Sequence, residues 1–248
     1  MKIAILTPVY LATKRVIECC EHIDANTKNE FVHVLVDDSS PNVRHINKLK
    51  TLANKNRAVL YYHDHVEPEK HRANITKALQ MGYDFLGTSL TEFDYLFVVE
   101  SDVMVPKNWD EDLISLSKLL PKQWMTLDVM PVDDDGEVTY PALKHNMNKG
   151  HESHGGRIFE VIPYSDWNAI LFSDNVVKAL KEGQWRFDEV PSHHDILLSR
   201  NFREKAGLER EEWNPATFFR TREVAAVHYA NSSRSELPEG MATPSNPA

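Results

Sequence analysis

Cysteine is almost absent from this chain, which contains only Cys19 and Cys20 among its 248 residues. The two are neighbours in a segment with helical spacing, where adjacent side chains diverge, so we expect no disulfide between them. Two cysteines also argue against a disulfide scaffold and against a cysteine zinc site. We therefore expect a cytoplasmic protein.

Long apolar runs are missing as well. The longest ones fall far short of the roughly 20 residues that a membrane-spanning helix needs. Residues 1–8 contain one lysine and a short apolar run that ends at Pro8, and they lack the apolar core and cleavage site of a signal peptide. We expect this segment to begin the first strand and expect no membrane insertion.

Positive charge is not in excess, since the formal net charge is −9. Broad nonspecific binding to DNA, RNA or anionic lipid relies on lysine and arginine, so this balance argues against it, although a local basic groove remains compatible. The chain is 42% hydrophobic and 26% charged, which is ordinary for a globular domain.

Strand and helix patterns alternate through the first half of the chain. Apolar runs rich in β-branched and aromatic residues predict strands, and apolar residues three and four apart predict amphipathic helices. The predicted strands are 2–10, 31–36, 58–62 and 95–99, and the predicted helices are 12–25, 43–54, 71–82 and 109–120. We take Gly82 as the end of the third helix. Such alternation favours a parallel sheet, so we predict an α/β fold with helices on both faces.

The second half is less regular. Predicted strands are 124–129, 137–140, 158–163, 168–172 and 223–229, and predicted helices are 175–181 and 194–206. We interpret Asp-Asp-Asp-Gly at 133–136 as a hairpin turn rather than a metal site. Residues 144–157 are polar and expected to be mobile, and residues 232–248 are expected to form a disordered tail. We predict one domain over residues 1–231.

Two carboxylates follow the predicted strand 95–99, in the triplet Glu100-Ser101-Asp102. Residues spaced i, i+2 on an extended segment share a face, and open α/β sheets bind ligands at the carboxyl ends of their strands. Hard oxygen ligands suit Mg²⁺ or Mn²⁺, which usually accompany phosphates. The triplet predicts a metal–diphosphate site, with a solvated acidic turn as the alternative.

Further motifs follow other predicted strands. They are TPVY at 7–10, VDDSSP at 36–41, HRANITKAL at 71–79, VVESDVMVP at 98–106, FDEV at 187–190 and HHDILLSR at 193–200. In this order and spacing they resemble the inverting, family-2-type glycosyltransferases, which have a GT-A fold with a mixed sheet. The resemblance covers residues 2–206.

The resemblance implies a nucleotide-sugar donor, most often a UDP-sugar, held with Mn²⁺ or Mg²⁺. The donor-binding residues would be Thr7, Pro8, Tyr10, Asp37, Asp38, His71, Arg72 and Glu100. Of these, Asp38 would contact the base while Asp37 supports the loop. Asp102, Glu100 and His228 would bind the metal, although a histidine in an apolar strand is often only structural.

The resemblance also implies that Asp195 is the general base, because inversion needs a group that removes a proton from the attacking hydroxyl. A carboxylate at a helix N-terminus would also stabilise the helix dipole. His194 stands where the family has a glutamate. It remains open whether His194 tunes Asp195, binds acceptor or takes part in proton transfer.

We therefore predict a metal-dependent inverting glycosyltransferase, a hexosyltransferase-like enzyme, with a donor half (1–120) and an acceptor half (121–231). The acceptor would be a hydroxyl compound such as a glycan. An alternative acceptor is a hydroxymethylated pyrimidine in DNA, approached through basic residues that are interleaved with glutamates. Those residues are Arg200, Arg203, Lys205, Arg210, Arg220 and Arg222.

Two other classes remain as alternatives. A nucleotidyltransferase would share the architecture and the carboxylates, but no glycine-rich loop follows Tyr10. A noncatalytic nucleotide-sugar-binding module would not need Asp195. We interpret residues 151–156 as a lid, or else as an unstructured polar loop, and Trp167, Trp185 and Trp213 as packing residues that could instead stack on a sugar or base.

Overall fold

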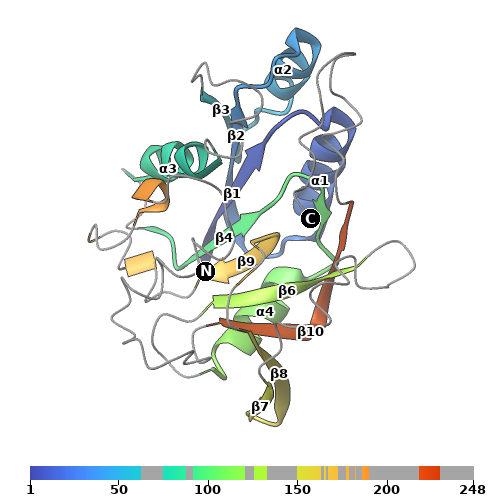
Figure 1. The fold of residues 1–248 in the computed structure, drawn as a ribbon, viewed down its shortest axis with the longest axis vertical. Coiled ribbons are helices and arrows are strands. Elements are labelled where there is room, and N and C mark those ends of the chain that lie inside the picture. The colour runs from blue at the N-terminus through green and yellow to red at the C-terminus, as the bar shows by residue number, and fades with distance from the viewer. Residues whose placement is uncertain are drawn as a thin grey trace, which may run out of the picture.

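A computed structural model shows a ten-stranded mixed sheet flanked by helices (Figure 1). It describes residues 1–62, 75–87, 92–120, 126–132, 150–162, 165, 167–172, 177–178, 182, 186–189 and 218–229. The strands are β1 (Lys2–Val9), β2 (Glu30–Asp38), β3 (Arg57–Tyr62), β4 (Tyr95–Val99), β5 (Val103–Met104), β6 (Thr126–Val132), β7 (Gly150–His154), β8 (Arg157–Ile162), β9 (Ala169–Phe172) and β10 (Phe218–His228). The helices are α1 (Thr13–Asn26), α2 (Val43–Lys50), α3 (Ile75–Leu86), α4 (Trp109–Ser117) and the 3₁₀ helix η3 (Phe187–Glu189). The predicted α/β class with a mixed sheet is confirmed.

The strand order is β3-β2-β1-β4-β9-β6-β10-β8-β7, and β5 pairs with β10. The first four strands are parallel, so the carboxyl ends of β1, β2 and β4 lie at one edge of the sheet. β9 runs antiparallel to β4, and its beginning therefore lies at the edge where β4 ends. This edge collects the residues that follow β1, β2 and β4 and those that precede β9.

Alternating residues of the strands build two cores, one on each face. Ile3, Ile5 and Phe97 pack under α1 and α4, whereas Leu6 and Val98 pack under α3 and η3. Figure 1 shows α1 and α3 on opposite sides of β1 and β2. The helices therefore cover both faces of the parallel half, as the alternation predicted.

The prediction that Gly82 ends the third helix is wrong, because α3 continues to Leu86. A Cβ atom at Gly82 would lie 2.3 Å from Leu6 Cδ1 and 2.8 Å from Val36 Cγ2. Glycine is therefore needed here for the close approach of α3 to β1 and β2, and not for a helix stop.

Other boundaries also differ from expectation. The second helix ends at Lys50 rather than Asn54, because Asn54 and Arg57 form a bridge that turns the chain into β3. Strand β10 begins at Phe218, earlier than the predicted Glu223.

The segment 150–162, expected to be a mobile polar loop up to residue 157, is instead the β7–β8 hairpin. Gly155 and Gly156 form its turn with φ of 57° and 78°. The alternative that residues 151–156 form an unstructured polar loop is therefore wrong, and the lid interpretation stays a prediction.

None of the helices in the described ranges is long and apolar enough to cross a membrane. The predicted turn at 133–136, the helix 194–206 and the tail 232–248 lie outside the described residues, as does most of the helix 175–181.

Candidate metal centre

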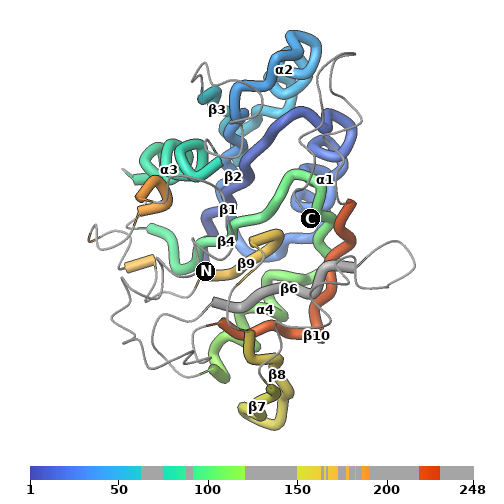
Figure 2. Tube along the Cα trace, in the orientation of Figure 1, coloured from blue at the N-terminus to red at the C-terminus, as the bar shows by residue number. Residues whose placement is uncertain are grey.

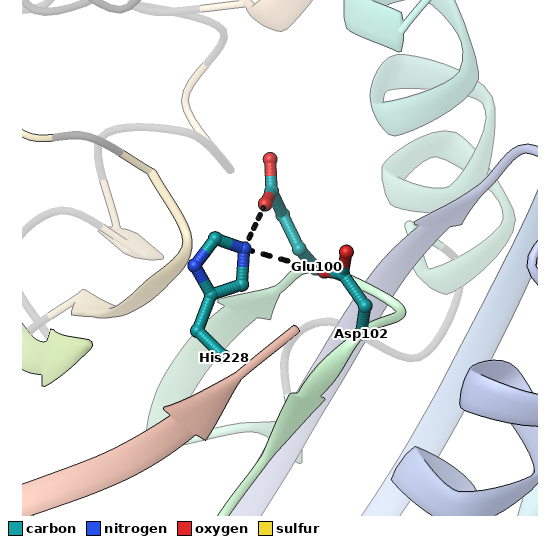
Figure 3. Close-up of side chains that lie close together, drawn as sticks. All are labelled: Glu100, Asp102 and His228. Atoms are coloured by element: carbon teal, nitrogen blue, oxygen red, sulfur yellow. Dashed lines mark ion pairs between the residues drawn. The ribbon is translucent and has the colours of Figure 1, made fainter. Parts of the chain in front are cut away.

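Three potential ligands meet at the carboxyl end of β4 (Figure 3). Nε2 of His228 lies 3.5 Å from Oε2 of Glu100 and 3.5 Å from Oδ1 of Asp102. One ligand atom from each residue lies within 4.8 Å of the other two. The structure thus brings together the three residues that the resemblance implied as metal ligands.

The backbone explains why these side chains converge. Val103 N donates to Glu100 O at 3.2 Å, which closes a tight turn between β4 and β5. β5 then pairs with the end of β10, where His228 lies opposite Val103. Tyr229 N donates to Asp102 O at 3.0 Å and fixes the same turn to β10.

A bend in β10 is what brings its end to this turn. Its register against β6 shifts between Thr221 and Ala225, as expected of a β-bulge. Figure 2 shows the strand (red) changing direction along its length. β10 pairs with β6 on both sides of this shift, and Val227 lies between Val132 of β6 and Met104 of β5.

The electrostatics of the centre are dominated by the two carboxylates. Burial alone would lower the pKa of His228, whose side chain is 1% exposed, but hydrogen bonds and charge from Asp102 and Glu100 outweigh it. The pKa of His228 is raised to about 10. The two carboxylates that stabilise the protonated imidazole would also favour a divalent cation at this position.

The ligand set fits Mn²⁺ better than Mg²⁺. Two carboxylates suit either ion, whereas an imidazole nitrogen is uncommon around Mg²⁺, which prefers oxygen ligands. The side chains of Glu100 and Asp102 are 30% and 15% exposed, so the centre is accessible from solvent on the carboxylate side.

Consecutive residues of β1 face opposite sides of the sheet. The hydroxyl of Thr7 lies on the side of α1, 2.9 Å from Nε2 of buried His33. Arg57 Nε donates to His33 Nδ1 at 3.0 Å, so Nε2 carries the ring proton and donates it to Thr7. Burial and the Arg57 charge hold the pKa of His33 well below its usual value. Thr7 is thus hydrogen-bonded inside the protein, and its role in a base pocket stays a prediction.

Asp37, at the end of β2, is bonded to its surroundings on the α1 side. Its Oδ2 accepts from Ser40 N at 3.1 Å, and its Oδ1 lies 3.4 Å from Nε2 of buried His45. His45 Nδ1 in turn lies 2.8 Å from Thr13 Oγ1. These contacts, which tie the β2 loop to α1 and α2, are those expected of a residue that supports the loop.

Asp38 lies on the opposite side, towards α3, as does Pro8 by alternation along β1. Burial and then the charges of Asp38 and Asp37 raise the pKa of Tyr10, so its phenol lies near both carboxylates. Pro8, Tyr10 and Asp38 therefore gather at the edge of β1 and β2, and β4, which Glu100 follows, is the strand next to β1.

The two loops at this edge hold non-glycine residues in left-handed conformations. Leu11, Ala12 and Ser39 have φ of 54°, 55° and 57°, and Ser40 Oγ accepts from Leu11 N at 2.9 Å. Such backbone costs about 1 kcal/mol or more per residue and is often found at functional sites. Ser40 and His45 were not singled out from the sequence, because their roles depend on this contact between loops.

Asn168 was also missed. Glu100 N donates to Asn168 O at 2.8 Å, one step beyond the β4–β9 pair Val99 and Ala169. No local pattern in the sequence could have found this residue, since it reaches the site only through pairing of two distant strands.

Several predicted site residues lie outside the described part of the chain. These are His71, Arg72, Trp185, His194, Asp195 and Trp213, together with Arg200, Arg203, Lys205 and Arg210. Arg220 is buried in β10, and Arg222 donates to Glu160. Arg220 is therefore not part of an open basic surface, whereas the side chain of Arg222 is 71% exposed and paired with a carboxylate. Trp167 packs on Phe172 in the core, as its interpretation as a packing residue expected.

No protein-family model matches the sequence, and no curated protein matches it. Solved structures do match. S. aureus TarS 1–349 is 16% identical with a TM-score of 0.59, and the match covers 92% of this chain and 60% of that one. In the complex of TarS 1–349 with UDP-GlcNAc the identity is 19% and the TM-score 0.55, over 96% of this chain and 62% of that one. A third match is the complex of TarS 1–349 with UDP, at 16% identity and a TM-score of 0.58, over 92% and 60% of the two chains.

At these identities the similarity establishes the fold. TarS is a GT-A family 2 glycosyltransferase, so the GT-A-like fold implied by the sequence motifs is confirmed. The chain spans about three fifths of the length of TarS 1–349.

Proposed function

We propose that this protein is a metal-dependent inverting glycosyltransferase that moves a sugar from a UDP-sugar to a hydroxyl acceptor. The observation that carries the proposal is the Glu100–Asp102–His228 cluster at the carboxyl end of β4. The GT-A-like fold supports it, because TarS shares that fold and has been crystallised with UDP and with UDP-GlcNAc.

The order of strands supports a nucleotide lying across the edge of the sheet. Asp38 ends β2, Pro8 lies on β1 and Tyr10 follows the end of β1. Glu100 follows β4, the next strand. Neighbouring strands are about 4.8 Å apart, so β2 and β4 are separated by roughly 10 Å. A uracil near Asp38 and a diphosphate near Glu100 would fit this separation.

Glu100, Asp102 and His228 would hold Mn²⁺, which would neutralise charge that develops on the leaving diphosphate. His228 would have to be neutral to act as a ligand, because an imidazole nitrogen that binds a metal ion carries no proton. Asp38 and Tyr10 would orient the nucleotide, and Asp37 would keep the loop in place through its contacts with Ser40 and His45.

The resemblance provides the catalytic groups. Asp195 would accept the proton of the acceptor hydroxyl as it attacks the anomeric carbon from the face opposite the diphosphate. His194, its neighbour, would adjust the basicity of that carboxylate or orient the acceptor. A glycan hydroxyl is the acceptor class that we propose.

Calorimetric titration of UDP with and without Mn²⁺ tests the donor site. The wild-type protein should bind UDP more tightly with Mn²⁺, and Asp102→Asn should lose this gain. Asp112→Asn is the matched control, because Asp112 is an exposed carboxylate on α4 outside the cluster. Absence of any UDP binding by folded wild-type protein would refute the proposed function.

Transfer itself is tested by NMR of the anomeric proton during hydrolysis of, or transfer from, a UDP-sugar. An inverted configuration at the anomeric carbon is expected. Asp195→Asn should abolish turnover while UDP binding with Mn²⁺ is kept. Retained turnover in this variant would contradict the assignment of the base but leave the donor site intact.

A further inference from the structure

Asn168 contains a buried amide that the fold leaves without a partner. The residue is 4% exposed, and its Nδ2 has no hydrogen-bond partner within the part of the chain that the structure describes. A buried donor that is left unpaired destabilises the folded protein, so such groups are rare unless a ligand or water completes them.

The position of Asn168 links this amide to the candidate metal centre. Its carbonyl accepts from Glu100 N at 2.8 Å, so the two residues lie directly opposite each other where β4 ends and β9 begins. Side chains of directly opposed residues on antiparallel strands share a face and lie about 5 Å apart. The amide therefore belongs to the same face and edge as the Glu100 carboxylate.

The backbone before Asn168 is held in an unusual conformation. Trp167 has φ of 59°, its N–H is accepted by Ser165 Oγ at 3.0 Å, and its ring packs on Phe172. A left-handed tryptophan is sterically costly, and the buried ring and hydrogen bond compensate for it. These contacts fix the backbone just before Asn168, and so fix the position of Asn168 at the edge of the sheet.

The order of strands identifies the ligand group that Asn168 would meet. Moving across the edge, β2 and β1 carry the residues proposed for the base, β4 carries the metal cluster, and β9 is the next strand. A nucleotide-sugar laid in this direction places its sugar beyond the diphosphate, one strand spacing of about 4.8 Å past Glu100. A neutral amide donor suits a sugar hydroxyl, whereas the charged diphosphate would be held at the cluster.

We propose that the side-chain amide of Asn168 donates a hydrogen bond to a hydroxyl of the donor sugar and so helps to select that sugar. This inference rests on the proposed function, because it takes the donor to be a nucleotide-sugar. The unpaired amide then lowers the stability of the free protein, and this loss is tolerated because the amide recognises the sugar.

The test compares Asn168→Leu with wild type in calorimetric titrations with UDP, UDP-glucose, UDP-galactose and UDP-GlcNAc in the presence of Mn²⁺. Leucine has a similar size and no donor. We expect unchanged UDP affinity, a loss of about three- to tenfold for the UDP-sugar that wild type prefers, and an equal or higher melting temperature. If leucine prevents folding, Asn168→Ala is measured in the same way.

Gln80→Leu is the matched control, since Gln80 is a buried amide on the same face whose oxygen accepts from Phe187 N and whose nitrogen donates to Asp84. It should lower the melting temperature and leave the preference among UDP-sugars unchanged.

Two results would overturn the inference. They are an equal loss of UDP and UDP-sugar affinity in Asn168→Leu, and an unchanged UDP-sugar affinity, whether or not the melting temperature falls. If wild type binds UDP, and the variant binds the UDP-sugars as tightly as wild type does, only this inference fails. If folded wild type binds neither UDP nor any UDP-sugar, the proposed function fails first.

Discussion

Binding of a divalent cation to the Glu100–Asp102–His228 cluster should displace a proton from His228. Burial lowers the pKa of this histidine, but Asp102 and Glu100 raise it to about 10, so the imidazole is protonated at neutral pH. A histidine that binds a metal ion must be neutral. The proton is held more tightly than on an ordinary histidine by about 5 kcal/mol, which the metal must overcome.

The sign of the pH effect follows from the raised pKa. Below about pH 10 the metal competes with the proton, so the affinity rises as the pH rises. Between pH 6.5 and 8.5 one proton should be released per ion, and the apparent affinity should increase about tenfold per pH unit. An ordinary histidine would lose its proton near pH 6.5 and would give almost no slope over most of this range.

Calorimetry of Mn²⁺ binding in two buffers with different ionisation enthalpies measures the released proton directly. The wild-type heat should depend on the buffer, and His228→Gln should bind more weakly with a heat that does not. Asp112→Asn, on the exposed side of α4, should behave as wild type. A wild-type heat that is independent of buffer, or an affinity that stays flat from pH 6.5 to 8.5, would refute this account of the centre.

Four further outcomes are expected. Gly82→Ala should lower the free energy of unfolding by about 1–3 kcal/mol in urea denaturation, because the new methyl group would overlap Leu6, and an unchanged value would show that the helix can move away. Asp38→Asn should weaken UDP binding at least about tenfold in calorimetry while Mn²⁺ affinity is kept, since a charge-assisted hydrogen bond to the base would be lost. Asp37→Asn should instead lower the melting temperature, as Asp37 is bonded within the protein, and equal behaviour of the two variants would contradict their separate roles. Arg57→Met should lower the free energy of unfolding by about 1–3 kcal/mol in urea denaturation, because Nδ1 of buried His33 would lose its hydrogen-bond donor. A stability equal to that of wild type would show that this hydrogen bond contributes little.

Much of the parallel half was predictable, because local patterns determine its elements. Apolar runs and helical spacing located β1, β2, β3 and β4 and the helices between them to within a few residues. The carboxylates after β4 were recognised for the same reason, since two acidic residues at the end of a buried strand form a local signal. β8 matches the predicted strand 158–163, whereas β7 was missed because its polar side chains hide the strand pattern, and its pairing with β8 rather than side-chain burial defines it.

The sequence by itself thus determined the α/β alternation, the carboxylates Glu100 and Asp102 at the end of β4, and the likeness to GT-A glycosyltransferases. The resemblance already implied His228 as the third member of this group, and the tertiary structure shows how it arrives there, through the pairing of β10 with β5. Only the tertiary structure decided that Asn168 lies opposite Glu100 and that Gly82 serves helix packing. The physical reason is range: the period of a strand or helix depends on neighbouring residues, whereas the pairing of distant strands depends on how the whole sheet packs.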